Sequence, residues 1–389
     1  MTINWLLPFM NLTGGIKVPL EYANQLAEQG HRVRVYYPGV IETAPTQRWY
    51  WSWFEAPLRQ LKYLIMVSWL KRHEAHWIAL NPKLELIRVP ALETRFIKPA
   101  DWQIATGQAN DWLIQLPESW GSKANLVQDY ESWVQSEAEL LRQLKNPSSH
   151  LIIISQQLAD KIHRLTGRGA DLLLANGVNT ELFQPPSSIK TESQAVKKIG
   201  LLNHAAPHKG SLRAWQTVRS LLLADSTLQI ELTVIGQTDP SHLKALQLPA
   251  SEKNRLKLNW LGELSQAELI TQLQKIDLLI YLPLEEGYGL LPLELMAMAV
   301  SVITTPVGAM PEYGQNVLYL TKGDPLDERS VIKQATALAQ QILSQPFELS
   351  RLQQGVKQAQ ALSLKQQTTK LSHWLNDQLF QKPNQELTQ

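Results

Sequence analysis

Residues 276–299 constrain the fold of this chain more than any other stretch. The stretch begins with the apolar run 276–280, interrupted only by Asp277, and this run predicts a buried parallel strand. A loop with two glycines follows, and Leu293 opens an apolar helix in which Pro292 is tolerated at the first turn. Strand–loop–helix units of this kind build open α/β sheets, which bind ligands outside the carboxyl ends of their strands. We therefore expect a ligand site at this loop.

The loop and the start of the helix carry two carboxylates, Glu286 and Glu294, and two glycines, Gly287 and Gly289. Glycine lets backbone amides approach a ligand closely, and the amino end of a helix favours an anion. Carboxylates accept hydrogen bonds from neutral hydroxyls, so a nucleotide-sugar, which has both hydroxyls and phosphates, would satisfy both kinds of group. An ordinary strand–turn–helix with an acidic loop accounts for the same residues, and the spacing alone leaves both interpretations open.

The string Glu286-Gly-Tyr-Gly, with seven residues between Glu286 and Glu294, resembles the donor-site signature of retaining glycosyltransferases of family 4. That family has the GT-B fold, so the resemblance implies an α/β protein with two Rossmann-like domains whose parallel sheets face a cleft. It also implies that Glu286 faces the sugar and the diphosphate and that Glu294 binds the ribose. The spacing selects Glu286 rather than its neighbour Glu285. The donor loop implied by the resemblance comprises Glu286, Gly287, Tyr288, Gly289, Leu290 and Glu294.

A second pattern of the same family follows the strand expected at 198–202. Lys209-Gly210 resembles the end of the family's R-x-x-x-x-K-G loop, whose lysine neutralises the donor diphosphate. A cation suits this position because negative charge grows on the leaving phosphate as the glycosidic bond breaks. His204 stands where the family usually has arginine, and an imidazole cannot make the two-pronged hydrogen bond of arginine. By the resemblance, Lys209 and Glu286 are the catalytic residues. His204, Lys209 and Gly210 join the donor site.

The first half of the chain carries two further patterns. Gly14 and Gly15 follow the first expected strand and resemble the glycine pair of the family's first loop, near the donor phosphates and the acceptor. A tight turn is the alternative interpretation. Asp129 and Glu131 end a strand in a string that resembles the acceptor half of rhamnosyltransferase-like members. The resemblance implies that these two carboxylates orient acceptor hydroxyls, and a plain strand-end turn is the other interpretation.

The length of 389 residues suggests two or three domains. Expected strands and helices alternate along the chain, which predicts parallel sheets. Residues 176–185 resemble the string that closes the first half in this family, and the polar residues 186–198 follow as a linker. We therefore expect an acceptor-side domain over 1–185 and a nucleotide-sugar domain over 186–365. By the resemblance, a helix at about 366–380 packs back on the first domain.

Composition argues against several classes of protein. The net charge of +2 gives no global field that would attract nucleic acid, and the absence of cysteine excludes disulfides and thiolate metal sites. The chain begins without a basic segment before its short apolar run, and no run of eighteen apolar residues occurs. We expect a cytoplasmic protein that needs no metal and no cofactor besides its nucleotide-sugar substrate.

Residues 48–77 combine tryptophans, aliphatic residues and basic residues, with helical spacing after Pro57. A basic, tryptophan-rich helix can lie in a membrane interface, which would place the protein peripherally on the inner face of the membrane. An insertion that packs on its own domain, with its basic residues in solvent, fits the pattern equally well. Both interpretations stay open.

The resemblance predicts a retaining glycosyltransferase that moves a hexosyl or deoxyhexosyl group from a nucleoside-diphosphate sugar to a hydroxyl acceptor. The acceptor would be a glycan, a lipid-linked molecule or another hydroxyl compound, in polysaccharide or glycoconjugate synthesis. Because no side-chain nucleophile can be placed on the donor face, we expect front-side attack with the leaving phosphate as base. Two alternatives stay open: a non-catalytic GT-B module that binds nucleotide-sugars, favoured by the missing arginine, and a sugar-nucleotide epimerase. A dinucleotide oxidoreductase is disfavoured, since no G-x-G-x-x-G follows either first strand.

Overall fold

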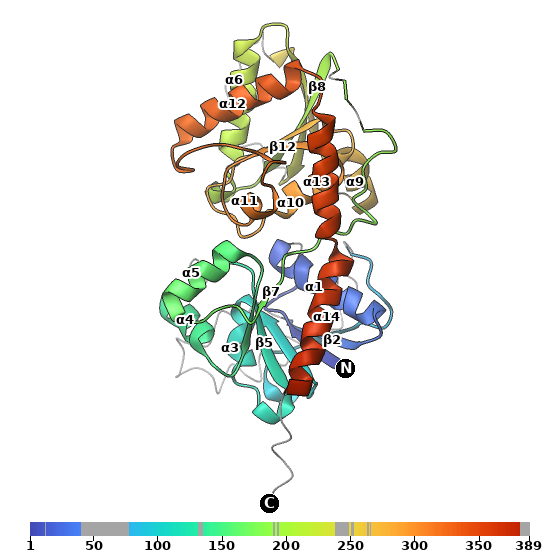
Figure 1. The fold of residues 1–389 in the computed structure, drawn as a ribbon, viewed down its shortest axis with the longest axis vertical. Helices are drawn as coiled ribbons and strands as arrows, with labels where there is room; N and C mark the ends of the chain where they lie inside the picture. Colours follow the sequence, from blue (N-terminus) through green and yellow to red (C-terminus); the bar gives the residue numbers. More distant parts are fainter. Residues whose placement is uncertain are drawn as a thin grey trace, which may run out of the picture. The chain divides into compact units, whose positions relative to one another are not determined.

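The chain divides into two compact units (Figure 1). Unit 1 comprises Met1–Gly177 and Leu364–Gln389, and unit 2 comprises Val178–Ser363. Two predicted features, the membrane-interface segment 48–77 and the acceptor carboxylate Glu131, lie outside the residues that the structure describes. The structure is a computed structural model that describes residues 1–11, 13–39, 78–130, 135–189, 191–192, 194–237, 249, 253–262, 264 and 266–381.

The described strands of unit 1 form one parallel sheet in the order β3-β2-β1-β4-β5-β6-β7. The order reverses between β1 and β4, because β2 and β3 extend the sheet on one side and the later strands extend it on the other. Ile3 of β1 lies beside Val33 of β2 and Trp102 of β4, and all three side chains are buried. The strands are β1 (Thr2–Leu6), β2 (Arg32–Pro38), β3 (Glu85–Val89), β4 (Trp102–Thr106), β5 (Ser122–Val127), β6 (His150–Ile153) and β7 (Leu172–Leu173).

Short polar residues and a glycine fix several helix ends in unit 1. The side chain of Ser155 accepts the backbone N–H of Leu158 at 3.2 Å and so caps α5, and Gly167 ends this helix in the left-handed region. Ser136 and Glu139 form a reciprocal capping box at the start of α4. The helices are α1 (Gly14–Glu28), α3 (Asn110–Leu113), α4 (Glu137–Lys145), α5 (Gln156–Thr166) and α14 (Leu364–Gln381), with 3₁₀ turns η2 (Thr94–Phe96), η3 (Gly107–Ala109) and η4 (Glu118–Trp120).

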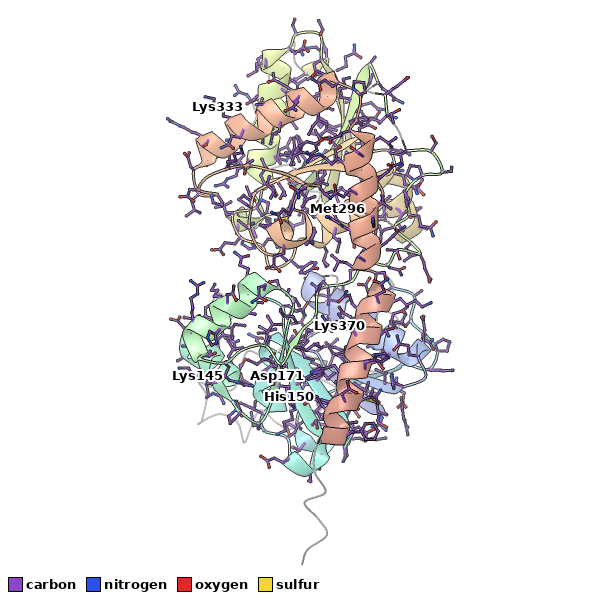
Figure 2. The ribbon with its side chains drawn as sticks, viewed as in Figure 1. Lys145, His150, Asp171, Met296, Lys333 and Lys370 are labelled. Carbon is purple, nitrogen blue, oxygen red and sulfur yellow. The ribbon has the colours of Figure 1, made fainter. Side chains whose placement is uncertain are left out.

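The last helix, α14, belongs to unit 1 although the chain reaches it only after unit 2. It runs beside α1, as the red helix in Figure 1 shows. The indole Nε1 of Trp102 donates to the carbonyl of Leu375 at 3.1 Å, inside the core. The Nζ of Lys370, labelled in Figure 2, donates to the carbonyl of Leu173 at 2.7 Å. The core of unit 1 is therefore built from residues near both ends of the chain.

Unit 2 is built on a second parallel sheet, with its described strands in the order β10-β9-β8-β11-β12-β13. The order reverses between β8 and β11, which are direct neighbours. Its strands are β8 (Val196–Asn203), β9 (Gln229–Gly236), β10 (Leu256–Trp260), β11 (Leu278–Tyr281), β12 (Ser301–Thr304) and β13 (Tyr319–Leu320). Its helices are α6 (Ser211–Ala224), α9 (Gln266–Leu273), α10 (Leu290–Ala297), α11 (Met310–Tyr313), α12 (Glu328–Ser344) and α13 (Leu349–Ala361), with the 3₁₀ turn η5 (Pro207–Lys209).

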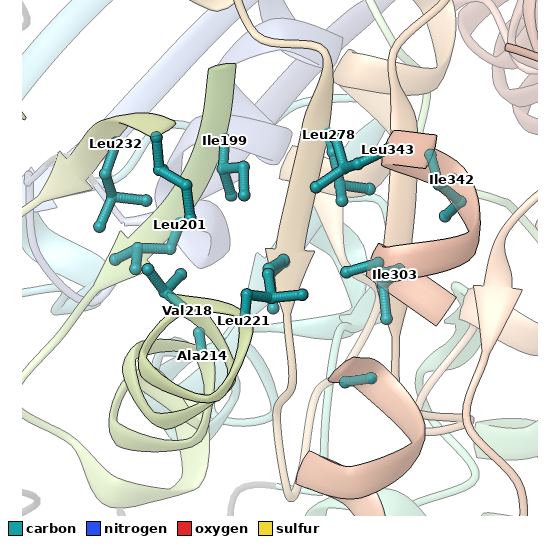
Figure 3. Packing of buried hydrophobic residues seen from close by; sticks show 14 of the residues in the cluster. Ile199, Leu201, Ala214, Val218, Leu221, Leu232, Leu278, Ile303, Ile342 and Leu343 are labelled. Carbon is teal, nitrogen blue, oxygen red and sulfur yellow. The ribbon is translucent and has the colours of Figure 1, made fainter. Parts of the chain in front are cut away.

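The core of unit 2 lies between this sheet and the helices α6 and α12 (Figure 3). Leu201 of β8 and Leu278 of β11 are fully buried there, together with Val218 of α6. Ile342 and Leu343 of α12 close the cluster. Complete burial of each such aliphatic side chain stabilises a fold by roughly 1.5–3 kcal/mol. This packing holds the strand ends, and the loops that follow them, in fixed positions.

The expected α/β fold with parallel sheets is confirmed in both units, with two local differences. The helix after the glycine loop begins at Leu290 rather than Leu293, because Gly289 adopts a left-handed conformation and serves as its N-cap. Gly14 and Gly15 are the first two residues of α1 rather than a turn before it. In both cases glycine lies at the start of a helix, which brings backbone N–H groups to the loop.

Candidate active site

Two loops of unit 2 meet where the strand order of its sheet reverses. They follow β8 and β11, and they hold the residues expected at the donor site. The backbone N–H of Leu284 donates to the carbonyl of His208 at 2.7 Å and ties the loops together. Gly210 has a φ of 69°, and a Cβ atom there would stand 1.7 Å from the carbonyl oxygen of Leu282. Glycine at this position lets the first loop, with Lys209, lie against the end of β11.

Lys209 and Glu286 form an ion pair across these two loops. The Nζ of Lys209 lies 3.0 Å from Oε2 of Glu286. The two side chains are 27% and 14% exposed, so water and salt screen this pair less than they screen a pair on the open surface. The resemblance implied a role at the donor for both residues, and the structure brings them into direct contact.

The same carboxylate accepts hydrogen bonds from two further donors. The hydroxyl of Tyr281, at the end of β11, donates to Oε2 of Glu286. The other oxygen, Oε1, accepts the backbone N–H of Gly287 at 3.2 Å. Burial raises the pKa of Tyr281 well above its ordinary value, and the charge of Glu286 raises that pKa further. The Tyr281 hydroxyl therefore keeps its proton throughout the neutral range and acts as a donor.

The glycine loop packs against the segment that follows β12. Gly289 has a φ of 86°, and a Cβ atom there would stand 2.8–2.9 Å from atoms of Met310 and Tyr313. The hydroxyl of Tyr313 donates to the carbonyl of Gly289 at 2.7 Å, and its ring stacks on Tyr288 at a centroid distance of 5.3 Å. Gly308 has a φ of 59°, and a Cβ there would stand 2.2 Å from the carbonyl oxygen of Glu286. The loop is thus fixed by contacts that leave no room for larger side chains.

Glu294 lies on the second turn of α10 and is half-buried. Burial raises the pKa of Tyr313 well above its ordinary value, and the neighbouring Tyr288 and the charges of Glu286 and Glu294 raise that pKa further. Both carboxylates therefore lie within electrostatic reach of one buried tyrosine. The structure places the two glutamates of the motif around the same glycine loop.

His204 lies in the first loop and is held by two hydrogen bonds. Its backbone N–H donates to Oγ of Ser211 at 2.9 Å, and its ring Nδ1 accepts the backbone N–H of Ala206 at 3.0 Å. A neutral ring in this arrangement carries its proton on Nε2. Burial is the largest cause that lowers the pKa of His204, and the charge of Lys209 lowers it further, while the charge of Glu286 opposes the shift. The ring is therefore a neutral donor at pH 7, unlike the arginine that the family usually has.

The described candidate residues of unit 1 follow β1 and β5. Gly14 and Gly15 begin α1 and are exposed, and a Cβ atom on Gly15 would meet nothing within 4 Å. The Nε2 of Gln128 donates to the carbonyl of Gly15 at 2.8 Å and to Oγ1 of Thr106 at 2.9 Å. Asp129 follows, and its Oδ1 accepts the backbone N–H of Tyr130 at 2.7 Å. Asp129 thus lies one residue from the side chain that ties α1 to the sheet.

Sequence reasoning missed two polar side chains at these sites. Tyr281 lay inside the motif stretch, but its only signal is a tyrosine at the last position of an otherwise aliphatic strand. Gln128 lay beside Asp129, and nothing in the sequence indicated that its amide reaches the start of α1. Both contacts depend on where a strand ends relative to its neighbours.

Within the described residues, no group of three or more histidine, aspartate or glutamate side chains is arranged to hold a metal ion. In the same part of the chain, no helix combines the length and the apolar character needed to cross a bilayer.

Residues 197–343 match the family described as "Glycosyl transferases group 1". The matched range includes both loops of the candidate site and most of unit 2. By this match, most of unit 2 is similar to group 1 glycosyltransferases. No curated protein sequence matches the chain.

Solved structures resemble the chain over nearly its whole length. Sucrose-phosphate synthase from Thermosynechococcus elongatus is 15% identical, with a TM-score of 0.68 over 98% of this chain and 99% of that one. HepE from Anabaena in complex with UDP and glucose is 14% identical, with a TM-score of 0.62 over 97% and 100%. α,α-Trehalose 6-phosphate synthase from Burkholderia multivorans is 9% identical, with a TM-score of 0.64 over 97% and 99%. At these identities the likeness establishes the fold, and the chain has the two parallel-sheet units of GT-B proteins.

Proposed function

We propose that this protein is a retaining glycosyltransferase that transfers a hexosyl or deoxyhexosyl group from a nucleoside-diphosphate sugar to a hydroxyl acceptor. The observation that carries the proposal is the contact between Lys209 and Glu286 at the switch point of unit 2, inside the range that matches group 1 glycosyltransferases. A cation and a carboxylate side by side suit a ligand with a diphosphate next to neutral hydroxyls. Open α/β sheets bind ligands at such switch points.

In the proposed complex the diphosphate takes the positive groups of the two loops. Lys209 turns from Glu286 to a phosphate oxygen, and the N–H groups at the start of α10 face the same anion. His204 donates from Nε2 as a neutral group, which replaces part of the missing arginine. Glu286 then accepts hydrogen bonds from sugar hydroxyls, and Glu294 accepts them from the ribose. No metal ion is required in this scheme, because the lysine and the helix start balance the diphosphate charge.

Retention follows from attack on the face that the leaving group occupies. The acceptor oxygen forms the new bond to the anomeric carbon while the bond from that carbon to the phosphate oxygen breaks. The acceptor's proton passes to the leaving phosphate, so no side-chain nucleophile is needed. Lys209 stabilises the charge that grows on the phosphate, which is where catalysis of this kind gains most.

Unit 1 supplies the acceptor side of the proposal. Gly14 and Gly15, at the exposed start of α1, keep the donor-binding role that the resemblance implies, near the donor phosphates and the acceptor. Asp129 is a carboxylate that accepts hydrogen bonds from acceptor hydroxyls. Glu131 stays a candidate for the same task outside the described residues. The acceptor class, a glycan or a lipid-linked or other hydroxyl compound in polysaccharide or glycoconjugate synthesis, is part of the proposal.

The first experiment is a binding screen followed by an assay. UDP is the first probe, because HepE structures hold UDP and UDP-glucose, with ADP, GDP and dTDP as comparators. A nucleoside diphosphate that binds the folded state raises the melting temperature by mass action. Chromatography of the matching nucleotide-sugar, with and without hydroxyl acceptors, then detects transfer or slow hydrolysis.

We expect Lys209→Ala and Glu286→Ala each to lower turnover tenfold or more, a change of about 1.4 kcal/mol in the barrier. The matched controls are Lys257→Ala and Glu231→Ala, which break a 3.2 Å ion pair in the same unit whose lysine is 73% exposed. The controls should leave turnover unchanged. Full activity in Lys209→Ala or in Glu286→Ala would refute the assignment of the site.

A non-catalytic module that binds nucleotide-sugars is the second candidate, favoured by His204 in place of arginine. It would bind a nucleoside diphosphate but show neither transfer nor hydrolysis. An epimerase would convert the donor sugar without any acceptor, and the same chromatography detects that product.

The proposed peripheral membrane contact through residues 48–77, on the inner face of a cytoplasmic membrane, is tested separately. Sedimentation with anionic liposomes at low salt should carry the protein down, and a protein that stays in solution argues against it.

A further inference from the structure

The Glu286 carboxylate is held by two side chains that differ in what a bound diphosphate would do to them. Lys209 and Tyr281 both donate to Oε2 of Glu286. The lysine is a mobile positive charge on a flexible stem, and 27% of its side chain is exposed. The tyrosine is neutral, 4% exposed and fixed in β11, where it lies beside Thr304 of β12.

A diphosphate at this site would compete with Glu286 for Lys209. The inference here rests on the proposed function, in which the donor's diphosphate binds near these loops. A diphosphate carries more negative charge than one carboxylate, so it draws the ammonium group toward itself. Glu286 is only 14% exposed, and a carboxylate at that depth is destabilised when it loses its cation and has no donor in exchange.

The geometry around Tyr281 provides that donor. The Tyr281 hydroxyl carries no net charge, and its ring is buried in β11, so the side chain stays in place when Lys209 turns to the phosphate. The hydrogen bond joins residue 281 to residue 286 across the loop between them, so it also fixes the direction of the carboxylate. The second oxygen, Oε1, is left at the glycine loop, near the N–H of Gly287.

We propose that Tyr281 is a positioning residue: its hydroxyl holds the Glu286 carboxylate in place when Lys209 turns to the donor diphosphate, so that the carboxylate stays directed at the sugar. A phenylalanine would fill the same apolar space but could not donate. Tyr281 therefore affects the reacting sugar only through Glu286, and its removal should have no effect once Glu286 can no longer act.

The first test is kinetic and uses Tyr281→Phe alone and in a Glu286→Gln background. In the wild-type background we expect turnover to fall about tenfold while KM for the nucleotide-sugar stays within about twofold, because Lys209 still binds the diphosphate. In the Glu286→Gln background, Tyr281→Phe should cause no further loss. An equal loss in both backgrounds, or wild-type turnover in Tyr281→Phe, overturns the proposal.

The second test needs no activity and measures hydrogen exchange of residues 278–290 in the full-length chain. Removing one donor leaves Glu286 with the other, so Lys209→Ala and Tyr281→Phe should each raise exchange modestly. The double variant should raise it by more than the product of the two single effects, because the carboxylate then has neither side-chain donor. If the exchange rate of the double variant equals the product of the two single effects, Lys209 and Tyr281 do not position Glu286 jointly. That result would overturn the proposal whether or not the protein is a transferase.

The matched control is Tyr22→Phe in unit 1, which removes the hydroxyl of another buried tyrosine, donated to the carbonyl of Ala175 at 2.7 Å. It should change neither turnover nor exchange over residues 278–290. If the wild-type protein turns over no nucleotide-sugar, the proposed function and the kinetic part of this inference fail together. The exchange experiment then decides the structural part by itself.

Discussion

The two units present the same kind of switch point with different chemistry. In unit 2 the loops at the switch point are charged and tightly fixed: Lys209 pairs with Glu286, and Gly210 has a left-handed backbone with no room for a Cβ atom. In unit 1 the contact that joins the start of α1 to the loop after β5 is a hydrogen bond between neutral groups, from the amide of Gln128 to the carbonyl of Gly15. A Cβ atom on Gly15 would meet open space.

This difference fits a division of labour between the units. A diphosphate needs opposing charge, and fixed dipoles act best when no reorganisation is required at the moment of reaction. A neutral hydroxyl acceptor needs only a few hydrogen-bonding groups and space. The comparison therefore predicts that a glycine-to-alanine substitution will lower the stability of the protein at the switch point of unit 2 but not at that of unit 1.

Alanine at Gly210 and at Gly15 should give the largest contrast. Gly210→Ala forces a left-handed alanine, which costs roughly 1–2 kcal/mol, and overpacks the end of β11, which typically costs about 1–3 kcal/mol more. Gly15→Ala meets no clash and should be neutral or stabilising by up to about 1 kcal/mol, since alanine favours a helix. Thermal unfolding of the two variants measures the difference. Equal losses at both positions would break the comparison.

Activity sharpens the same pair of variants. If the start of α1 receives a ligand, Gly15→Ala should lower turnover while the protein stays as stable as the wild type. A Gly15→Ala protein with wild-type turnover would make Gly15 a residue of the helix start with no part in ligand binding.

The C-terminal ends of two helices, one in each unit, offer a smaller contrast. Ala299, just after α10, has a φ of 59°, whereas unit 1 places Gly167 at a φ of 75° after α5. Ala299→Gly should stabilise unit 2 by less than about 1 kcal/mol, because the relief of left-handed strain is partly offset by the entropy of glycine in the unfolded chain. Gly167→Ala should destabilise unit 1 by a similar amount. Denaturant unfolding checks both signs, and stabilisation by Gly167→Ala would contradict the argument.

The smallest expected effect is a difference in acid sensitivity between the units. The pKa of His204 is lowered from 6.5, so its contribution to stability is complete above about pH 6.5 and is lost as the pH falls below it. Burial alone would raise the pKa of Asp171, but hydrogen bonds from His150 and the Leu151 amide, with the charge of Arg168, lower it below 3.8. The Asp171 contribution therefore persists down to about pH 3.8 and is lost only below that.

Hydrogen-exchange protection, corrected for the intrinsic effect of pH, should consequently fall in the loop around His204 before it falls around Asp171. The variant His204→Gln should remove the loss below pH 6.5 in unit 2 and leave unit 1 unchanged. Loss of protection in both units over one common pH range would contradict the different electrostatic design of the two sites.

The sequence allowed the fold to be predicted, together with two residues that the structure brings into contact, for a physical reason. Alternating strands and helices imply parallel sheets, and parallel sheets bring loops that are far apart in the chain to one edge. Lys209 and Glu286 are 77 residues apart and still meet, because β8 and β11 are neighbours. The motifs supplied the two residues, and the topology explains their contact.

The remaining features depend on details that a motif does not encode. The hydroxyl of Tyr281 reaches Glu286 only because β11 ends at that tyrosine. The ring of His204 is fixed by a backbone N–H two residues away, which follows from the local path of the loop. Gln128 reaches the carbonyl of Gly15, which already belongs to α1 because that helix begins at Gly14. Such contacts are set by the exact ends of strands and helices, which sequence patterns locate least well.

The point where the chain leaves unit 1 and comes back to it has a consequence for how the protein is made. A Cβ atom on Gly177 would stand 2.4 Å from the Cα of Leu364, and an isolated β-bridge joins Val178 to Ser363. The segment that leaves unit 1 and the segment that returns to it therefore lie side by side. On the ribosome, all of unit 2 is synthesised before α14 emerges. Unit 2 can therefore fold first, whereas the Trp102 side chain of unit 1 becomes covered only after α14 has been synthesised.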